Sequence, residues 1–244
     1  MSAKNVILQA TGIGKSFGGL RVLTDVNFAI AAREAVGIVG PNGAGKTTFL
    51  SVLVGAHAPT SGTLHFDGKD IARMEAPERC RKGIVRTHQV PRPFLGMTIF
   101  ENVLTAATHG GGFHGDEASD RALESLRLSG MLHIANRKAE TLGLMDRKRL
   151  ELARALATNP TLLLLDEIGG GLTDAEAQEL VEIIQRVLGG GVAIIWIEHI
   201  VHILLQVAQR LICMDAGRII ADGDPKAVIS DPMVVAAYLG GGAG

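Results

Sequence analysis

The residues best suited to chemistry form a glycine-rich loop. The letters GPNGAGKTT follow the apolar run AVGIV and precede a helical pattern. Backbone N–H groups can surround an anion only where side chains leave room, so Gly43 and Gly45 suit a phosphate cradle at a helix start. Lys46 would reach the β- and γ-phosphates, and the Thr47 hydroxyl would hold Mg²⁺. The predicted nucleotide site consists of Gly40, Pro41, Asn42, Gly43, Ala44, Gly45, Lys46, Thr47 and Thr48.

Two carboxylates follow a second apolar run, LLLLDE. A buried strand ending in this pair would deliver Asp166 to the magnesium shell. It would bring Glu167 to the edge of the site, where a carboxylate can polarise an attacking water. Two acids at a strand end can also simply cap the next helix. Because a phosphate loop occurs earlier in the chain, we favour the catalytic interpretation.

Two more polar residues end strand-like runs. Gln89 ends GIVRTHQ and could contact Mg²⁺ or the water, and His199 ends VAIIWIEH and could sense the γ-phosphate. Either residue alone is more often an ordinary strand-end residue. Ligands of parallel-sheet proteins bind at the carboxyl edge of the sheet, so we expect both residues to converge there with the loop and the carboxylates.

Alternating strands and helices must position these residues. The runs VILQATGI, RVLTDVNFAI and AVGIVG predict strands, TTFLSVLVGA predicts a buried helix, and GTLHFDGKDI predicts a strand with an Asp67-Gly68 turn. Helical patterns then dominate, and strands alternate with helices after residue 160. We predict an α/β fold with a mainly parallel sheet, an antiparallel β portion at the N-terminus and a helical subdomain at about 90–158.

Composition favours one globular domain over residues 1–244, because 47% of the residues are hydrophobic and the net charge is -1. Such a balance gives no field for nucleic acid, and no nucleic-acid partner is expected. The basic cluster Arg147-Lys148-Arg149 is short enough to be a solvated helix face.

The cysteines and the loop histidines show no metal-binding spacing. Cys80 and Cys213 are expected to be packed thiols in a reducing compartment. His109 and His114 lie in HGGGFHG without a third ligand nearby, so we expect a solvated loop. No apolar stretch is long and uninterrupted enough to predict a transmembrane segment or a signal peptide.

The order GPNGAGKTT, RTHQ, LELARAL, LLLLDE and IEH resembles the ATP-binding subunit of ABC transporters over almost the whole chain. Within that superfamily, KSFGGLRVLTDVNF, GIVRTHQVPRPFLGMTIFENVL and ADGDPKAVISDPMVVAAYLG are similar to the cytoplasmic ATPases of branched-chain amino acid importers. The resemblance implies a P-loop ATPase in which Phe17 stacks on adenine, Gln89 links the site to the membrane subunits, and His199 is the switch histidine.

The same resemblance implies cofactors, partners and a location. ATP and Mg²⁺ are the expected cofactors, with Thr47, Gln89 and Asp166 at the metal. The expected partners are membrane permease subunits, a second ATPase subunit that is either another copy or a different chain, and indirectly a periplasmic solute-binding protein. The chain would then be cytoplasmic and peripheral on the inner face of the cell membrane. Its partners would choose the solute, which the sequence does not name.

One motif departs from the family. The usual Leu-Ser-Gly-Gly-Gln signature, which completes the partner's ATP site, is replaced by Leu142, Gly143, Leu144, Met145 and Asp146. A hydroxyl donor is missing at Gly143, and Met145 replaces a glycine that permits close approach. One hydrogen bond to a charged group is worth about 1.5–3 kcal/mol, so we expect a weakened site, with Met145 as the greater obstacle.

Two smaller departures are Ile168, where the family usually has proline, and Thr173, where many members have aspartate. Neither removes a catalytic group. A different partner with an ordinary signature would give one normal and one altered composite site, and a homodimer with two altered sites is the alternative.

Of four rival functions, two are compatible with the sequence and two lack the features that they require. An ATPase of a lipid or lipopolysaccharide exporter has a similar size. A regulatory subunit that binds ATP with weak hydrolysis is compatible with the altered signature. ABC proteins of DNA repair or translation carry long coiled-coil inserts or tandem units, and a GTPase would need an Asn-Lys-x-Asp motif; the sequence has none of these.

Overall fold

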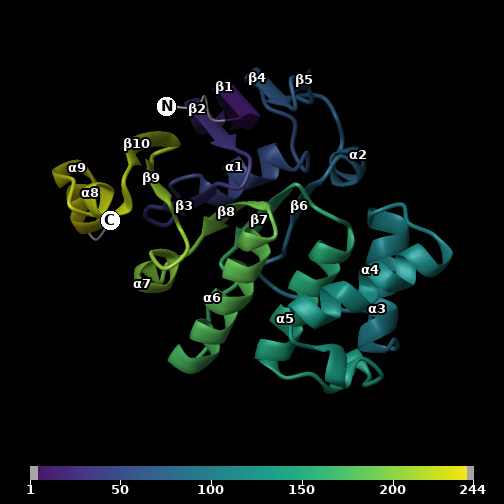
Figure 1. Ribbon diagram of the computed structural model, residues 1–244. Helices are drawn as coiled ribbons and strands as arrows, with labels where there is room; N and C mark the ends of the chain where they lie inside the picture. The colour runs from purple at the N-terminus through teal and green to yellow at the C-terminus, as the bar shows by residue number, and fades with distance from the viewer. Residues whose placement is uncertain (1–4, 241–244) are drawn as a thin grey trace. The chain divides into compact units, whose positions relative to one another are not determined.

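The structure is a computed structural model that describes residues 5–240. The chain divides into two compact units, one formed by residues up to 76 and from 193 onward, the other by residues 77–192 (Figure 1). Both units combine strands and helices, as the α/β prediction requires.

An antiparallel sheet opens the first unit and confirms the predicted N-terminal β portion. Its strand order is β2-β1-β4-β5. The predicted turn joins the last two strands, and both of its residues, Asp67 and Gly68, have positive φ angles of 47° and 73°, as a tight hairpin turn requires. The strands are β1 (Val6–Phe17), β2 (Leu20–Ala31), β4 (Ser61–Phe66) and β5 (Lys69–Asp70).

The other strands of the first unit are mainly parallel. β3 pairs in parallel with β8 and β9, and β10 pairs antiparallel with β9. β3 and β8 are buried along their whole length, which accounts for their unbroken apolar sequences. Helix α1 (Lys46–Leu53) follows β3, and the short α7 (Val201–Leu204) follows β8. The strands are β3 (Ala35–Val39), β8 (Ala193–Ile197), β9 (Arg210–Asp215) and β10 (Arg218–Gly223).

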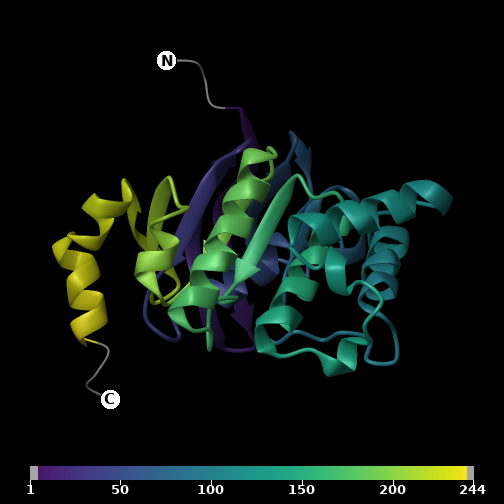
Figure 2. The same cartoon turned by 60° about the horizontal axis from the view of Figure 1, so that its bottom comes forward.

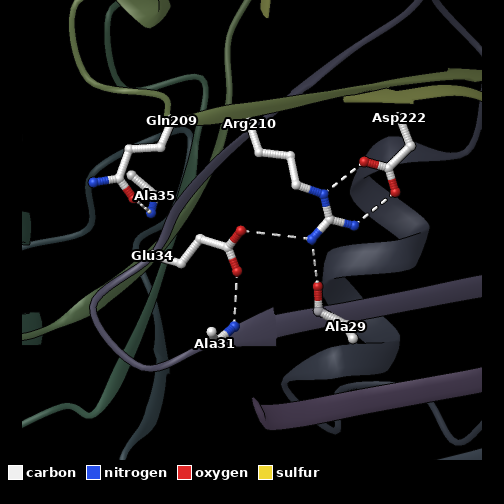
Figure 3. A network of polar contacts seen from close by, with 7 residues as sticks. All are labelled: Ala29, Ala31, Glu34, Ala35, Gln209, Arg210 and Asp222. Atoms are coloured by element: carbon white, nitrogen blue, oxygen red, sulfur yellow. Dashed lines mark hydrogen bonds and ion pairs between the residues drawn. The ribbon is translucent and has the colours of Figure 1, made fainter. Parts of the chain in front are cut away.

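A buried acid fixes the turn before β3 (Figure 3). The Glu34 carboxylate accepts a hydrogen bond from the Ala31 N–H at 2.8 Å and lies 3.7 Å from the Arg210 guanidinium. Arg210 also donates to both Asp222 oxygens at 2.6 Å and to the Ala29 carbonyl at 2.9 Å. The network therefore ties β3, which leads into the glycine loop, to β9 and β10.

Two helices, yellow in Figure 2, complete the first unit: α8 (Pro225–Ile229) and α9 (Pro232–Gly240). The apolar patterns alone did not predict them, although their start signals are present. The Asp224 carboxylate accepts hydrogen bonds from the N–H groups of Lys226 and Ala227, and Pro225 occupies the first helical position.

The second unit contains two parallel strands, β6 (Ile84–Arg86) and β7 (Leu162–Asp166). β6 is shorter than the predicted GIVRTHQ strand, although the Thr87 N–H still donates to the Leu164 carbonyl at 2.9 Å. Helix α2 (Ala76–Arg81) leads into β6, and α6 (Asp174–Gly189) follows β7.

Helices make up the rest of the second unit, where α3, α4 and α5 pack against one another (teal in Figure 2). Thr98 and Glu101 form a capping box at the start of α3. Small and apolar side chains fill the core between these helices, including Ile99, Val103, Ala122, Leu126, Leu150 and Ala153. The helical elements are α3 (Ile99–Thr105), the π-helical turn η1 (Ala106–Gly110), α4 (Gly115–Leu128), the 3₁₀ turns η2 (Leu132–Ile134) and η3 (Ala139–Thr141), and α5 (Leu144–Ala157).

The cysteines are free thiols, and burial raises the pKa of both, that of Cys213 to about 11. His109 and His114 are exposed. Within residues 5–240, no three metal-ligating side chains gather in a cluster. No helix in that range has the length and apolar character needed to cross a membrane.

Candidate active site

The glycine loop of the first unit has the backbone of an anion cradle. Gly43 and Gly45 both have positive φ angles, of 81° and 96°. A Cβ atom at Gly45 would lie 2.9 Å from a Leu23 methyl carbon and 3.1 Å from the Val22 carbonyl oxygen, so a larger residue would require these neighbours to shift and would strain the backbone. α1 begins immediately afterwards at Lys46, which places the N–H groups of a helix start beside the loop.

The lysine of this loop is held at the loop itself. Lys46 is 6% exposed, and its ammonium group donates to the carbonyl oxygens of Gly40 at 2.7 Å and Pro41 at 3.0 Å. Asn42 and Thr47 are exposed. The loop therefore has a cation at its centre and accessible polar side chains at its rim, a donor set that suits phosphate groups.

Two further predicted site residues lie in the first unit. Phe17 is 43% exposed, with the His57 ring in an edge contact at 5.1 Å between centroids and the Lys15 ammonium 4.9 Å from the ring centroid. His199 is exposed just beyond β8. Its backbone N–H donates to the carboxylate of the buried Glu198 at 3.1 Å. Phe17 thus offers an accessible aromatic ring of the kind on which a base can stack.

The carboxylate of Asp166 ends β7 in the second unit and is 1% exposed. One of its oxygens, Oδ2, is paired with the guanidinium of Arg86 from β6. The other, Oδ1, has no hydrogen-bond partner within the described part of the chain. A buried carboxylate oxygen without a partner is costly, and Mg²⁺ takes oxygen ligands of this kind. Asp166 therefore fits the predicted metal role.

Gln89 and Glu167, which the sequence places 78 positions apart, meet in the second unit. The Gln89 amide donates a hydrogen bond to the Glu167 carboxylate. Glu167 has a φ of 50°, a left-handed conformation that is uncommon for a residue with a side chain and concentrates at functional sites. The chain thus turns sharply at Glu167, directly after the buried strand.

The altered signature lies at the start of α5, which has no side-chain cap. Gly143 is the N-cap residue and supplies no side-chain hydrogen bond. Leu144 is 50% exposed, whereas Met145 is only 8% exposed. Leu144 also stands at a glycine position of Leu-Ser-Gly-Gly-Gln and is the more exposed of the two side chains. The expectation that Met145 is the greater obstacle stays a prediction.

The interpretation of the basic cluster as a solvated helix face is wrong. Lys148 is 5% exposed, and its ammonium donates to the carbonyl oxygens of Ile168, at 2.7 Å, and Gly170. Arg149 pairs with Glu179. The helical spacing of the sequence could have predicted the burial of Lys148, because this residue lies four positions before the buried Leu152 and so shares its face of α5.

Thr173 starts α6 as its N-cap. Its hydroxyl accepts from the Glu176 N–H at 3.3 Å, and the Glu176 carboxylate accepts from the Thr173 N–H at 2.8 Å. The latter hydrogen bond lowers the pKa of Glu176. Threonine therefore supplies the capping function at this position.

Comparison with known families decides the identity of this fold. The ABC transporter family profile matches residues 23–169, and a profile described as branched-chain amino acid ATP-binding cassette transporter matches residues 218–244. The chain belongs to the ABC transporter ATP-binding family. As an ABC ATPase, it hydrolyses ATP to ADP and phosphate.

Relatives and solved structures agree with this assignment. The ABC ATPase is 36% identical to the high-affinity branched-chain amino acid transport ATP-binding protein LivG of Escherichia coli and 34% identical to BraF of Pseudomonas aeruginosa, each match covering 96% of this chain and 98% of the relative. The ADP conformation of MJ1267, an ATP-binding cassette of an ABC transporter, superimposes with a TM-score of 0.88 at 31% identity, covering 96% of this chain and 99% of that structure.

The predicted site residues thus divide between the units. The loop, Phe17 and His199 belong to the first unit, and Gln89, Asp166, Glu167 and the signature belong to the second. The structure brings Gln89 to Glu167 within the second unit. The convergence of both groups on one nucleotide stays a prediction.

Proposed function

We propose that this ABC ATPase is the ATP-hydrolysing subunit of an importer for branched-chain or related amino acids. The observation that carries the proposal is similarity along the whole chain to two branched-chain amino acid transport proteins, LivG and BraF, together with the separate C-terminal match over residues 218–244. In this role, binding and hydrolysis of ATP drive transport through membrane permease subunits.

The glycine loop is proposed to hold the triphosphate. The loop from Gly40 to Thr48 surrounds the phosphates, with the backbone N–H groups that follow Pro41 directed at them. Lys46 neutralises the β- and γ-phosphates after leaving the carbonyls that it contacts in the structure. The exposed ring of Phe17 stacks on adenine. The arrangement of these groups within one unit supports the proposal.

The second unit is proposed to supply the groups that act on water. Mg²⁺, when bound, neutralises charge on the phosphates, and the residues that hold it are Asp166, Thr47 and Gln89. Glu167 orients the attacking water and takes up its proton. The hydrogen bond from Gln89 holds the Glu167 carboxylate in place, and His199 contacts the γ-phosphate. The water oxygen bonds to the γ-phosphorus as the bond to ADP breaks.

A second ATPase subunit is proposed to complete the site. The exposed Leu144 and the missing hydroxyl at Gly143 favour a different chain with an ordinary signature over a second copy. The proposed location is the cytoplasmic face of the membrane, beside the permease, with a periplasmic solute-binding protein acting indirectly. The proposed domain organisation is one ABC ATPase domain with a helical subdomain at about 90–158.

One alternative function is favoured by a specific match. The chain is 32% identical to the lipopolysaccharide export system ATP-binding protein LptB of Haemophilus influenzae, covering 96% of this chain and 97% of the relative. In this alternative the same ATPase chemistry would drive export of a lipid.

Uptake in cells discriminates the two functions. Cells of the source organism that lack this chain are supplied with the wild type or with Glu167→Gln, and uptake of radiolabelled leucine is measured, with an unrelated sugar as control. The proposal expects leucine uptake only with the wild type and unchanged sugar uptake. Normal leucine uptake without the chain, together with a loss of surface lipid, would favour the exporter.

A further inference from the structure

The C-terminal helix contacts the glycine loop from the far end of the chain. The N–H of Gly40 donates a hydrogen bond to the Tyr238 hydroxyl at 2.8 Å, across 198 positions of sequence. Both residues belong to the first unit. The first residue of the loop is thus linked to α9 by a single side-chain oxygen.

Gly40 is a tightly constrained position. It is buried and has a φ of 143°, and a Cβ atom there would lie 2.0 Å from the Met214 carbonyl oxygen. Its carbonyl accepts from the Lys46 ammonium while its N–H donates to Tyr238. Because a buried N–H without a partner is costly, loss of the phenolic oxygen would favour a shift of this residue.

Further contacts bring the C-terminal segment alongside the loop. The Gly217 N–H, between β9 and β10, donates to the Ala44 carbonyl at 3.0 Å. A hollow of about 560 Å³ is lined by Pro41 and Asn42 of the loop and by α9 residues, including Met233 and Ala237. The loop therefore has contacts with this segment near both of its ends.

We propose that Tyr238 is a positioning residue for ATP binding, whose hydroxyl holds Gly40 and thereby keeps the phosphate cradle in its binding conformation. This inference rests on the proposed role of the loop as the triphosphate site. A cradle that is held in place before the ligand arrives loses less conformational freedom on binding, and it therefore binds more tightly.

The chemistry of the phenol fits this role. Burial raises the pKa of Tyr238, so the hydroxyl stays neutral at physiological pH and its oxygen accepts from an N–H without bringing a negative charge next to bound phosphates. Phenylalanine has the same ring and lacks only this oxygen. Tyr238→Phe therefore tests the hydrogen bond with little change in the packing of α9.

The test measures ATP affinity of the full chain by calorimetry for the wild type, Tyr238→Phe, Val235→Ala and Lys46→Ala. Val235 is an exposed residue of the same helix and serves as the matched control. We expect Tyr238→Phe to weaken ATP binding about 10-fold, as loss of one hydrogen bond predicts. Val235→Ala should bind as the wild type does, and Lys46→Ala should lose most binding.

A spectroscopic readout separates positioning from general stability. The chain has one tyrosine, so 3-fluorotyrosine gives a single ¹⁹F resonance, which should move when ATP binds and stay in place with Lys46→Ala. Unchanged affinity in Tyr238→Phe would overturn the inference, whether or not the resonance moves, provided that Lys46→Ala abolishes binding. Undiminished binding by Lys46→Ala would instead overturn the proposed loop function.

Discussion

Asp166 is buried and paired through one oxygen with Arg86, so that its other oxygen is the one without a partner in the described part of the chain. The pairing occurs between adjacent parallel strands of one unit, β6 and β7. Arg86 therefore stabilises the buried negative charge of Asp166, and it leaves one carboxylate oxygen for the Mg²⁺ that we propose Asp166 holds.

Removal of Arg86 should show how far the buried Asp166 carboxylate depends on its cationic partner. Arg86→Met leaves the Asp166 carboxylate buried without its cation, so we expect the free energy of unfolding to fall by about 3 kcal/mol. Urea denaturation measures this loss. Adding Asp166→Asn removes the buried charge, so the double variant should be more stable than Arg86→Met alone. Additive losses in the double variant would show that the two groups do not depend on each other.

The altered signature should limit ATP hydrolysis by the chain alone. Restoring the family residues by Gly143→Ser, Leu144→Gly and Met145→Gly should raise the ATPase rate of the isolated chain by about 10- to 100-fold, because a hydroxyl donor returns and the exposed leucine is removed. Leu132→Gly removes another exposed leucine and serves as the control. A triple variant no faster than the wild type would contradict the proposed defect.

Lys148 should contribute to stability through the loop that follows Glu167. Lys148→Met keeps the aliphatic chain but leaves the carbonyl groups of Ile168 and Gly170 without this donor, so we expect a loss of about 2 kcal/mol in the free energy of unfolding. Lys138 donates to the Gly96 carbonyl from an exposed position, and Lys138→Met should have little effect. Equal losses in the two variants would refute the buried role.

The capping box of α6 should make part of the stability depend on pH. The pKa of Glu176 is lowered from 4.5 by the Thr173 N–H, so the ionised form is favoured in the folded state. The stabilisation by the ionised Glu176 carboxylate is present above pH 4.5 and is lost as pH falls through the lowered pKa. Thr173→Ala should cost about 1 kcal/mol at neutral pH, and thermal melts should show a smaller difference in acid. Thr173→Asp, which also caps, should stay close to the wild type.

Local patterns predicted the elements that depend on local chemistry. The buried strands β3, β7 and β8 read as apolar runs, and the glycine loop has a fixed spacing and context. The helix of the signature also began close to its expected place, because apolar side chains recur along RKRLELARAL at helical spacing.

Contacts between distant residues could not be predicted in this way. The hydrogen bond of Gly40 with Tyr238 and the pairing of Arg86 with Asp166 depend on how strands and helices pack, which no local pattern encodes. The burial of Lys148 was missed because a cluster of three cations usually favours water, whereas here loop carbonyls accept hydrogen bonds from its ammonium group.

The role of Glu167 is tested most directly by phosphate release from the transporter complex that we propose, isolated from its own cells with wild-type, Glu167→Gln or Glu182→Gln chains. Glu182 is an exposed glutamate of α6 and controls for the loss of one carboxylate. We expect Glu167→Gln to lower the rate by at least about 10-fold, since a positioned base contributes about 10²–10⁴-fold, and Glu182→Gln to leave it unchanged. Equal rates for the two variants would contradict the assignment of Glu167 as the group that acts on water.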